Sequence, residues 1–219
     1  MKQLALIHTV DWFHMSVVNP FAKPWLEKTS GVEIQNYCDD TLLKESLKAG
    51  KATPNVLRRI VQYAICAENA GADAVMITCT TVNEAAGIAR KLLNIPAFNI
   101  DEPMAWEAVQ KGEKIGIVAT VPTSAPATKR LLQEAAKELN KTVSIKTAIN
   151  EEAFAALMSG DRKTHDELVH KEIDKLAKSV DVIALGQISL GQIIYNCGKP
   201  ILQVGESGFR EAEKILFGS

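Results

Sequence analysis

Short apolar runs alternate along this chain with segments whose apolar residues recur at helical spacing. The apolar runs predict strands near residues 4–9, 32–37, 73–78, 97–100, 114–119, 142–147, 181–185 and 200–204. Helical patterns fill nearly all of the intervals between them. This alternation is typical of an α/β protein in which helices cover parallel sheets.

Two of the predicted helices have clear ends. Thr53 and Pro54 have the features of an N-cap followed by proline in the first turn, and Gly71 is a suitable C-terminal stop. A second long helix is expected from about Asp161 to Ser179. Each of these helices leads directly into a strand that begins with aspartate.

Four segments of the first half resemble four segments of the second half in the same order. The pairs are residues 2–8 with 114–120, 32–36 with 143–147, 73–81 with 181–189, and 95–100 with 199–204. Apolar strands resemble one another, so the argument rests on the shared order of all four pairs. We therefore expect an α/β fold of two pseudo-symmetric lobes, each with a parallel sheet, and a site between them. The expected lobes are residues 1–104, completed by a C-terminal helix at 205–219, and residues 105–204.

Composition narrows the classes of partner. The 219 residues carry a net charge of −1 at pH 7, which leaves no basic face for nucleic acid. No apolar run is long enough for a membrane span, and the first residues do not form a signal peptide. The four cysteines lack the spacing of a zinc site or disulfide framework, so no metal is expected. These features predict a cytoplasmic protein that binds a small anionic molecule, with a homodimer or larger homo-oligomer as the default assembly.

The carboxyl ends of parallel strands are where open α/β sheets bind ligands, and polar residues follow the matching strands of both halves. Cys79 ends one strand and is followed by Thr80 and Thr81, whereas Gln187 and Ser189 stand in the second copy. Backbone N–H groups at a helix start would lower the pKa of Cys79 toward neutrality and, with the two threonine hydroxyls, hold a carboxylate. The alternative is that Cys79 is a buried apolar filler.

The first strand of each half also ends in polar residues. His8 is followed by Thr9, and the matched segments make Thr120 the counterpart of His8. Thr123 and Ser124 then open a helix, where they are either anion ligands or ordinary capping residues. His8 is either an acid/base group or a hydrogen-bonded group that orients another side chain.

Other chemically active residues are expected to be structural. Cys38, Cys66 and Cys197 have no helix-start environment, and His14, His165 and His170 are expected on the surface or in loops. Asp39, Asp40, Asn150 and Glu151 follow strands and are expected to be helix caps that could also support the site.

These residues carry a resemblance to a known family. Cys79, Thr80 and Thr81 resemble the Cys-Asn-Thr motif of the aspartate/glutamate/hydantoin racemase superfamily, and residues 114–123 resemble the opening of its second half. The similarity covers nearly the whole chain. It implies two α/β halves related by a pseudo-twofold axis, a ligand between them, and a cofactor-independent racemase or isomerase with one acid/base cysteine from each half.

The chain departs from that pattern at Gln187, which stands where the second cysteine would be. Residues 185–189 resemble the Leu-Ala-Gln-x-Ser pattern of a less characterised branch of the superfamily. An amide cannot accept or release a proton usefully near pH 7, so a symmetric pair of cysteines is excluded.

Several functions therefore stay open. The first is a racemase or isomerase acting at the carbon next to a carboxylate or carbonyl of a small acid, with Cys79 as base or nucleophile and with His8 in the second role. A decarboxylase or lyase in which Cys79 protonates one face is also consistent with these residues. A noncatalytic protein that binds a small anion is the alternative from another class.

Overall fold

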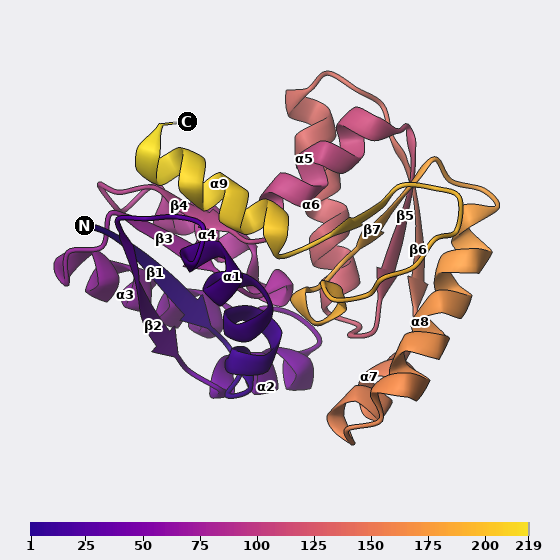
Figure 1. Ribbon diagram of the computed structural model, residues 1–219, viewed down its shortest axis with the longest axis horizontal. Helices are drawn as coiled ribbons and strands as arrows, with labels where there is room; N and C mark the ends of the chain where they lie inside the picture. The colour runs from indigo at the N-terminus through magenta and orange to yellow at the C-terminus, as the bar shows by residue number, and fades with distance from the viewer. Residues whose placement is uncertain (219) are drawn as a thin grey trace. The chain divides into compact units, whose positions relative to one another are not determined.

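A computed structural model describes residues 1–218 of the chain and contains two four-stranded sheets (Figure 1). The strand order is β2-β1-β3-β4 in the first sheet and β6-β5-β7-β8 in the second. Every strand pair in both sheets is parallel. The predicted α/β class with two parallel sheets is confirmed.

The first compact unit comprises residues 1–102 together with the segment from Gly205 onward. Its elements are β1 (Lys2–His8), the π-helix η1 (His14–Ala22), α1 (Lys23–Leu26), β2 (Val32–Cys38), α2 (Thr41–Ala49), α3 (Pro54–Asn69), β3 (Ala74–Ile77), the 3-10 helix η2 (Thr80–Val82), α4 (Glu84–Ala89), β4 (Ala97–Asn99) and the C-terminal helix α9 (Glu206–Phe217).

The direction of each connection between parallel strands determines which face of the sheet its helices cover. The connection from β1 to β2 runs opposite to that from β2 to β3, so right-handed crossovers put η1 and α1 on one face and α2 and α3 on the other. Helix α9 returns to the face of η1 and α1, where the rings of Trp25 and Phe209 lie 5.4 Å apart. The C-terminal helix thus completes the unit that contains the N-terminus.

The second unit comprises Pro103–Val204. Its elements are α5 (Glu102–Lys111), which begins at the boundary, β5 (Lys114–Ala119), α6 (Ser124–Glu138), β6 (Ser144–Ile149), α7 (Glu151–Met158), α8 (Arg162–Ala177), β7 (Val182–Leu185), the 3-10 helix η3 (Ile188–Leu190) and β8 (Ile201–Gln203). Helices α6 and α8 cover opposite faces of its sheet, as the reversal of strand order requires (Figure 1).

The predicted ends of two helices are confirmed by the contacts of their capping residues. The hydroxyl of Thr53 accepts a hydrogen bond from the N–H of Val56 at 3.2 Å, and the carboxylate of Asp161 accepts one from the N–H of Thr164 at 3.0 Å. Gly71 has a φ of 86°, the left-handed conformation that ends a helix. The local chemistry of these segments therefore fixes α3 and α8.

The register of the ladders corrects one of the four matched segments. Leu4 pairs with Ala74 in the first sheet as Ile115 pairs with Val182 in the second. The first strands are therefore offset by one residue from the sequence match, and Thr9 is the counterpart of Thr120. Apolar strands look alike at several offsets, so only the hydrogen-bond register identifies corresponding positions.

The expectation that His165 lies on the surface or in a loop is wrong. This residue is fully buried on α8, and its Nδ1 lies 2.7 Å from a carboxylate oxygen of Asp166. Burial lowers the pKa of His165, which favours the neutral ring. His165 lies on the buried face of α8. Its neighbours in the sequence are mostly polar, so the sequence did not indicate that this position is buried. His14 is exposed, as expected, and Cys66 is exposed on α3.

Candidate active site

Polar residues gather at the carboxyl edge of each sheet. We call Thr9, Cys79–Asn83, Asn99 and Asp101 the first half-site, and Thr120–Ser124, Gln187 and Ser189 the second half-site. The first half-site belongs to the first compact unit, and the second half-site belongs to the second. Together they contain every expected site residue except His8, which is the last residue of β1.

Cys79 lies between β3 and η2 in extended conformation, with φ −136° and ψ 121°, and is partly exposed. Burial of the thiol raises its pKa above the ordinary value, although the Thr9 hydroxyl and the N–H groups of Thr81 and Val82 act in the opposite direction. The expectation of a lowered pKa is therefore wrong. The helical segments after Cys79 have only three and six residues, so their dipole is too weak to offset the loss of solvation.

Asp101, two residues beyond β4, is a site residue that the sequence did not single out. The side chain is fully buried, and one carboxylate oxygen, Oδ2, accepts a hydrogen bond from Asn83 Nδ2 at 3.2 Å. Burial raises the pKa of Asp101 to about 7, against the lowering effect of Asn83. Its charge in turn raises the pKa of Cys79. The available signal was an acid at a strand end, which sequence alone does not distinguish from a helix cap.

Asn99 links these two residues. Its amide nitrogen donates to the backbone carbonyl of Cys79 at 3.1 Å, and its amide oxygen accepts from the N–H of Asp101 at 3.4 Å. The side chain is fully buried. The ends of β3 and β4 are therefore tied to each other at the position of the thiol and the carboxylate.

His8 is enclosed by contacts from three directions. Its ring stacks on Phe13 with centroids 4.0 Å apart, Nδ1 lies 2.9 Å from Thr78 Oγ1, and Nε2 lies 2.9 Å from Asn36 Oδ1. Burial lowers the pKa of His8 to about 4, so the ring is neutral near pH 7. Both ring nitrogens are engaged, which fits the orienting role; the acid/base role of His8 stays a prediction.

Gln187 is held by five hydrogen bonds within the second half-site. Its amide oxygen accepts from the N–H groups of Thr120 and Val121 at 3.0 and 3.1 Å. The same oxygen lies 3.1 Å from Ser124 Oγ. The amide nitrogen donates to Thr120 Oγ1 at 2.7 Å and to Ser189 Oγ at 2.6 Å. Backbone N–H groups can only donate, so the orientation of this amide is fixed, and both of its N–H bonds are used.

This arrangement changes the role of the hydroxyl groups around Gln187. Thr120 and Ser189 accept from the amide nitrogen, so the proton of each hydroxyl is left to donate to another group. Ser124 directs its hydroxyl to the carbonyl of Val121 at 2.8 Å or to the amide oxygen. At the start of α6 the Ser124 hydroxyl lies 3.1 Å from the amide oxygen of Gln187. Anion binding by Thr123 and Ser124 stays a prediction.

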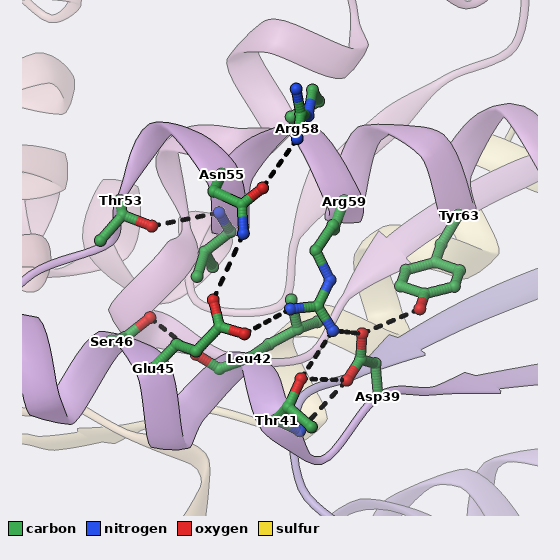
Figure 2. Close-up of polar contacts among 11 residues, drawn as sticks. Asp39, Thr41, Leu42, Glu45, Ser46, Thr53, Asn55, Arg58, Arg59 and Tyr63 are labelled. Atoms are coloured by element: carbon green, nitrogen blue, oxygen red, sulfur yellow. Dashed lines mark hydrogen bonds and ion pairs between the residues drawn. The ribbon is translucent and has the colours of Figure 1, made fainter.

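Asp39 and Asn150 have the structural contacts of capping residues. Asp39 accepts from the N–H and hydroxyl of Thr41 at 3.1 and 2.7 Å, from the Tyr63 hydroxyl at 2.8 Å, and from the Arg59 guanidinium (Figure 2). Asn150 accepts from the N–H of Ala153 at 3.0 Å at the start of α7. Hydrogen bonds thus lock Asp39 between α2 and α3.

Residues 1–218 contain neither a metal-binding cluster nor a membrane-spanning helix. This part of the chain contains no cluster of three or more histidine, cysteine, aspartate or glutamate side chains arranged to hold a metal ion. None of its helices has both the length and the apolar character needed to cross a membrane.

Several solved structures that share this fold are described as racemases or as a racemase homologue. The chain matches an aspartate racemase homologue from Pyrococcus horikoshii with a TM-score of 0.75 and 18% identity over 99% of each chain. It matches allantoin racemase from Klebsiella pneumoniae with a TM-score of 0.72 and 16% identity, covering 98% of this chain and 87% of that one. For glutamate racemase from Aquifex pyrophilus the TM-score is 0.64 and the identity 17%, covering 97% and 83%.

Sequence comparison identifies the family. No curated protein matches the chain, but the family model described as Asp/Glu/Hydantoin racemase matches residues 43–212. That range includes Cys79, Asp101 and Gln187. It extends over most of both compact units. This protein therefore belongs to the Asp/Glu/hydantoin racemase family and is an enzyme of the racemase type.

Proposed function

We propose that this enzyme removes and returns the proton on the carbon next to the carboxylate of a small acid, with Cys79 as the acid/base group. The observation that carries the proposal is the environment of the thiol. It is partly exposed at the carboxyl end of β3, with the Thr9 hydroxyl and two backbone N–H groups at the sulfur. An apolar filler would have no such set of donors.

The raised pKa of Cys79 determines the protonation state of the side chain before the reaction. Near neutral pH the group is a thiol, since burial disfavours the charged thiolate. A thiol is ready to donate a proton, and it must lose one before it can act as a base or nucleophile. The three donors at the sulfur then stabilise the thiolate when it forms.

The substrate carboxylate is proposed to accept hydrogen bonds from Thr120 and Ser189. Gln187 orients both hydroxyls by donating to their oxygens, which leaves each proton for the ligand. Both side chains are more than nine-tenths buried, so these hydrogen bonds would form in a site with little competing water. Thr80, Thr81 and Thr123 remain predicted substrate contacts.

A decarboxylase or lyase is the second candidate, and Gln187 is the observation that favours it. The amide does not act as an acid or a base near neutral pH, and its hydrogen bonds hold it against Thr120 and Ser189. Proton transfer would then take place only on the face of the substrate carbon next to Cys79. A decarboxylase or lyase needs only one such protonation. A covalent isomerase and a noncatalytic binder are the remaining alternatives.

The test is incubation in heavy water with a panel of amino, hydroxy and unsaturated mono- and dicarboxylates, followed by NMR. We expect deuterium at the carbon next to the carboxylate of one class of acid. Replacing Cys79 with serine should lower that exchange by about 100-fold or more, while Cys66→Ser, at an exposed helical position, should leave it unchanged. Exchange that persists in Cys79→Ser would refute the assignment of Cys79, and a new product in place of exchange would favour the second candidate.

A further inference from the structure

Two buried polar atoms near Cys79 make no hydrogen bond of standard geometry within residues 1–218. They are Oδ1 of Asp101 and Oγ1 of Thr80, whose residues are 0% and 2% exposed. An unsatisfied buried polar group costs about 1–3 kcal/mol, so such atoms are rare and mark places where another group is expected to bind or a proton to move. Thr80 directly follows Cys79 in the chain.

The positions of these atoms are fixed relative to the thiol. Asn99 hydrogen-bonds the carbonyl of Cys79 and the N–H of Asp101, and Asn83 holds the second oxygen of the Asp101 carboxylate. The carboxylate is near enough for its charge to act on Cys79, and the Thr80 hydroxyl lies beside it. Asn83 therefore anchors Oδ2 of Asp101, and the Thr80 hydroxyl is a second polar group that acts on the same carboxylate.

We propose that Asp101 is a positioning residue that exchanges the thiol proton of Cys79, directly or through the hydroxyl of Thr80. The inference rests on the proposed function, and it supplies the second titratable group that Gln187 does not provide. Asp101 acts through the sulfur and not on the substrate. Its role is to create the thiolate at the moment when the substrate proton is removed.

The proton transfers balance without any further reactant. The Sγ–H bond of Cys79 breaks and an O–H bond forms on Oδ1 of Asp101, which leaves a thiolate and a neutral carboxyl group. The thiolate then takes the proton from the substrate carbon, and the electron pair of that C–H bond is delocalised into the adjacent carboxylate group. Return of a proton from Sγ to carbon and of the Asp101 proton to Sγ restores the starting state.

The buried carboxyl group is suited to this exchange near neutral pH. Its pKa of about 7, which burial raises, lets it both hold and release a proton under these conditions. The negative charges that act on the pair are few: Glu102 raises the pKa of Asp101, and Asp101 raises that of Cys79. Loss of the Asp101 charge should therefore make the Cys79 thiol more acidic.

The test measures thiol acidity and turnover in the same variant. In Asp101→Asn, alkylation of Cys79 by iodoacetamide near neutral pH should become roughly threefold or more faster, because removal of a negative charge lowers the thiol pKa. Deuterium exchange into the substrate should fall about 100-fold, because the proton acceptor is gone. Asp101→Glu should restore part of the exchange. A matched Asp174→Asn variant, which alters a surface hydrogen bond to Tyr195, should change neither rate.

Opposite changes of the two rates distinguish this role from a structural one, which would slow exchange and leave all four thiols more reactive. Exchange retained in Asp101→Asn but lost in Cys79→Ser would overturn the inference and leave the proposed function standing. Exchange retained in Cys79→Ser would overturn both. Should Asp101→Asn not fold, the wild-type pH profile decides. A rise of exchange near pH 7 supports the inference, and a rise only where free thiols ionise refutes it.

Discussion

Thr9 and Thr120 occupy the same position in the two sheets, and each contacts the residue that distinguishes its half-site. The Thr9 hydroxyl interacts with the thiol of Cys79, and the Thr120 hydroxyl accepts from the amide of Gln187 at 2.7 Å. The strand register makes the two threonines equivalent. The duplicated scaffold is thus kept, while one copy holds a titratable group and the other a fixed amide.

Removal of the Gln187 amide should destabilise the second unit. Gln187→Ala leaves the N–H groups of Thr120 and Val121 without their acceptor. With a cost of about 1–3 kcal/mol for each unsatisfied group, we expect the free energy of unfolding to fall by roughly 2–4 kcal/mol. Urea denaturation measures this, with Gln110→Ala at an exposed position as the control. A fall below about 0.5 kcal/mol would show that water replaces the amide oxygen easily.

Proton exchange should occur with a single stereochemical outcome. Cys79 is the acid/base group of the proposal, and the amide of Gln187 does not gain or lose a proton usefully near pH 7. Deuterium should therefore enter one enantiomer of the substrate ahead of the other, as chiral chromatography with mass spectrometry would show. Gln187→Cys should add weak exchange from a second face if its thiol reaches the carbon. Equal initial exchange into both enantiomers by the wild type would point to a second full acid/base group.

His8 should make stability depend on pH below neutrality. The pKa is 6.5 in an ordinary environment and about 4 in the fold, so the unfolded chain binds the proton more tightly. Stability is then lost as pH falls from about 6.5 toward 4, by on the order of 3 kcal/mol. His8→Gln should flatten this part of the curve in urea unfolding, whereas His14→Gln, at an exposed position, should not. An unchanged curve for His8→Gln would mean that other groups cause the dependence.

Asp39 should make the stability of the fold depend on pH in the acidic range, below the range in which His8 acts. Burial raises its pKa, but the hydrogen bonds from Thr41, Tyr63 and Arg59 outweigh this effect and the net pKa is lowered (Figure 2). A lowered carboxyl pKa gives stability that is present above the ordinary value of 3.8 and lost as pH falls through the folded value. Asp39→Asn should cost about 1–3 kcal/mol at pH 7 and less near pH 2, while Asp40→Asn, beside the exposed Lys44, should cost far less. Thermal unfolding at both pH values provides the comparison.

Alkylation of Cys79 should be slow at neutral pH. The sequence predicted a lowered pKa for Cys79, but burial raises the pKa and keeps the thiol protonated. Cys66 is exposed on α3, so iodoacetamide should modify it first. The rate at Cys79 should rise steeply with pH, as peptide mapping by mass spectrometry would show. Faster modification of Cys79 than of Cys66 at pH 7 would restore the original expectation of an activated thiolate.

The sequence was sufficient for features that depend on short-range chemistry. Short apolar runs predicted the strands, and apolar residues at helical spacing predicted the long helices. Thr53 and Asp161 marked helix starts that the structure places at the same residues. The polar residues after the strands placed Cys79 and Gln187 at corresponding sheet edges, because parallel strands bring their carboxyl ends together.

The tertiary structure decided everything that depends on burial and on directional bonds. The register that makes Thr9 the counterpart of Thr120 is a property of the hydrogen-bond ladder, which similar apolar strands do not encode. The raised pKa of Cys79 and the buried state of Asp101 follow from the exclusion of water, which residue type does not reveal. The five bonds that fix Gln187 come from segments more than sixty residues away in sequence as well as from its near neighbour Ser189. Packing alone brings those donors and acceptors within reach of one amide.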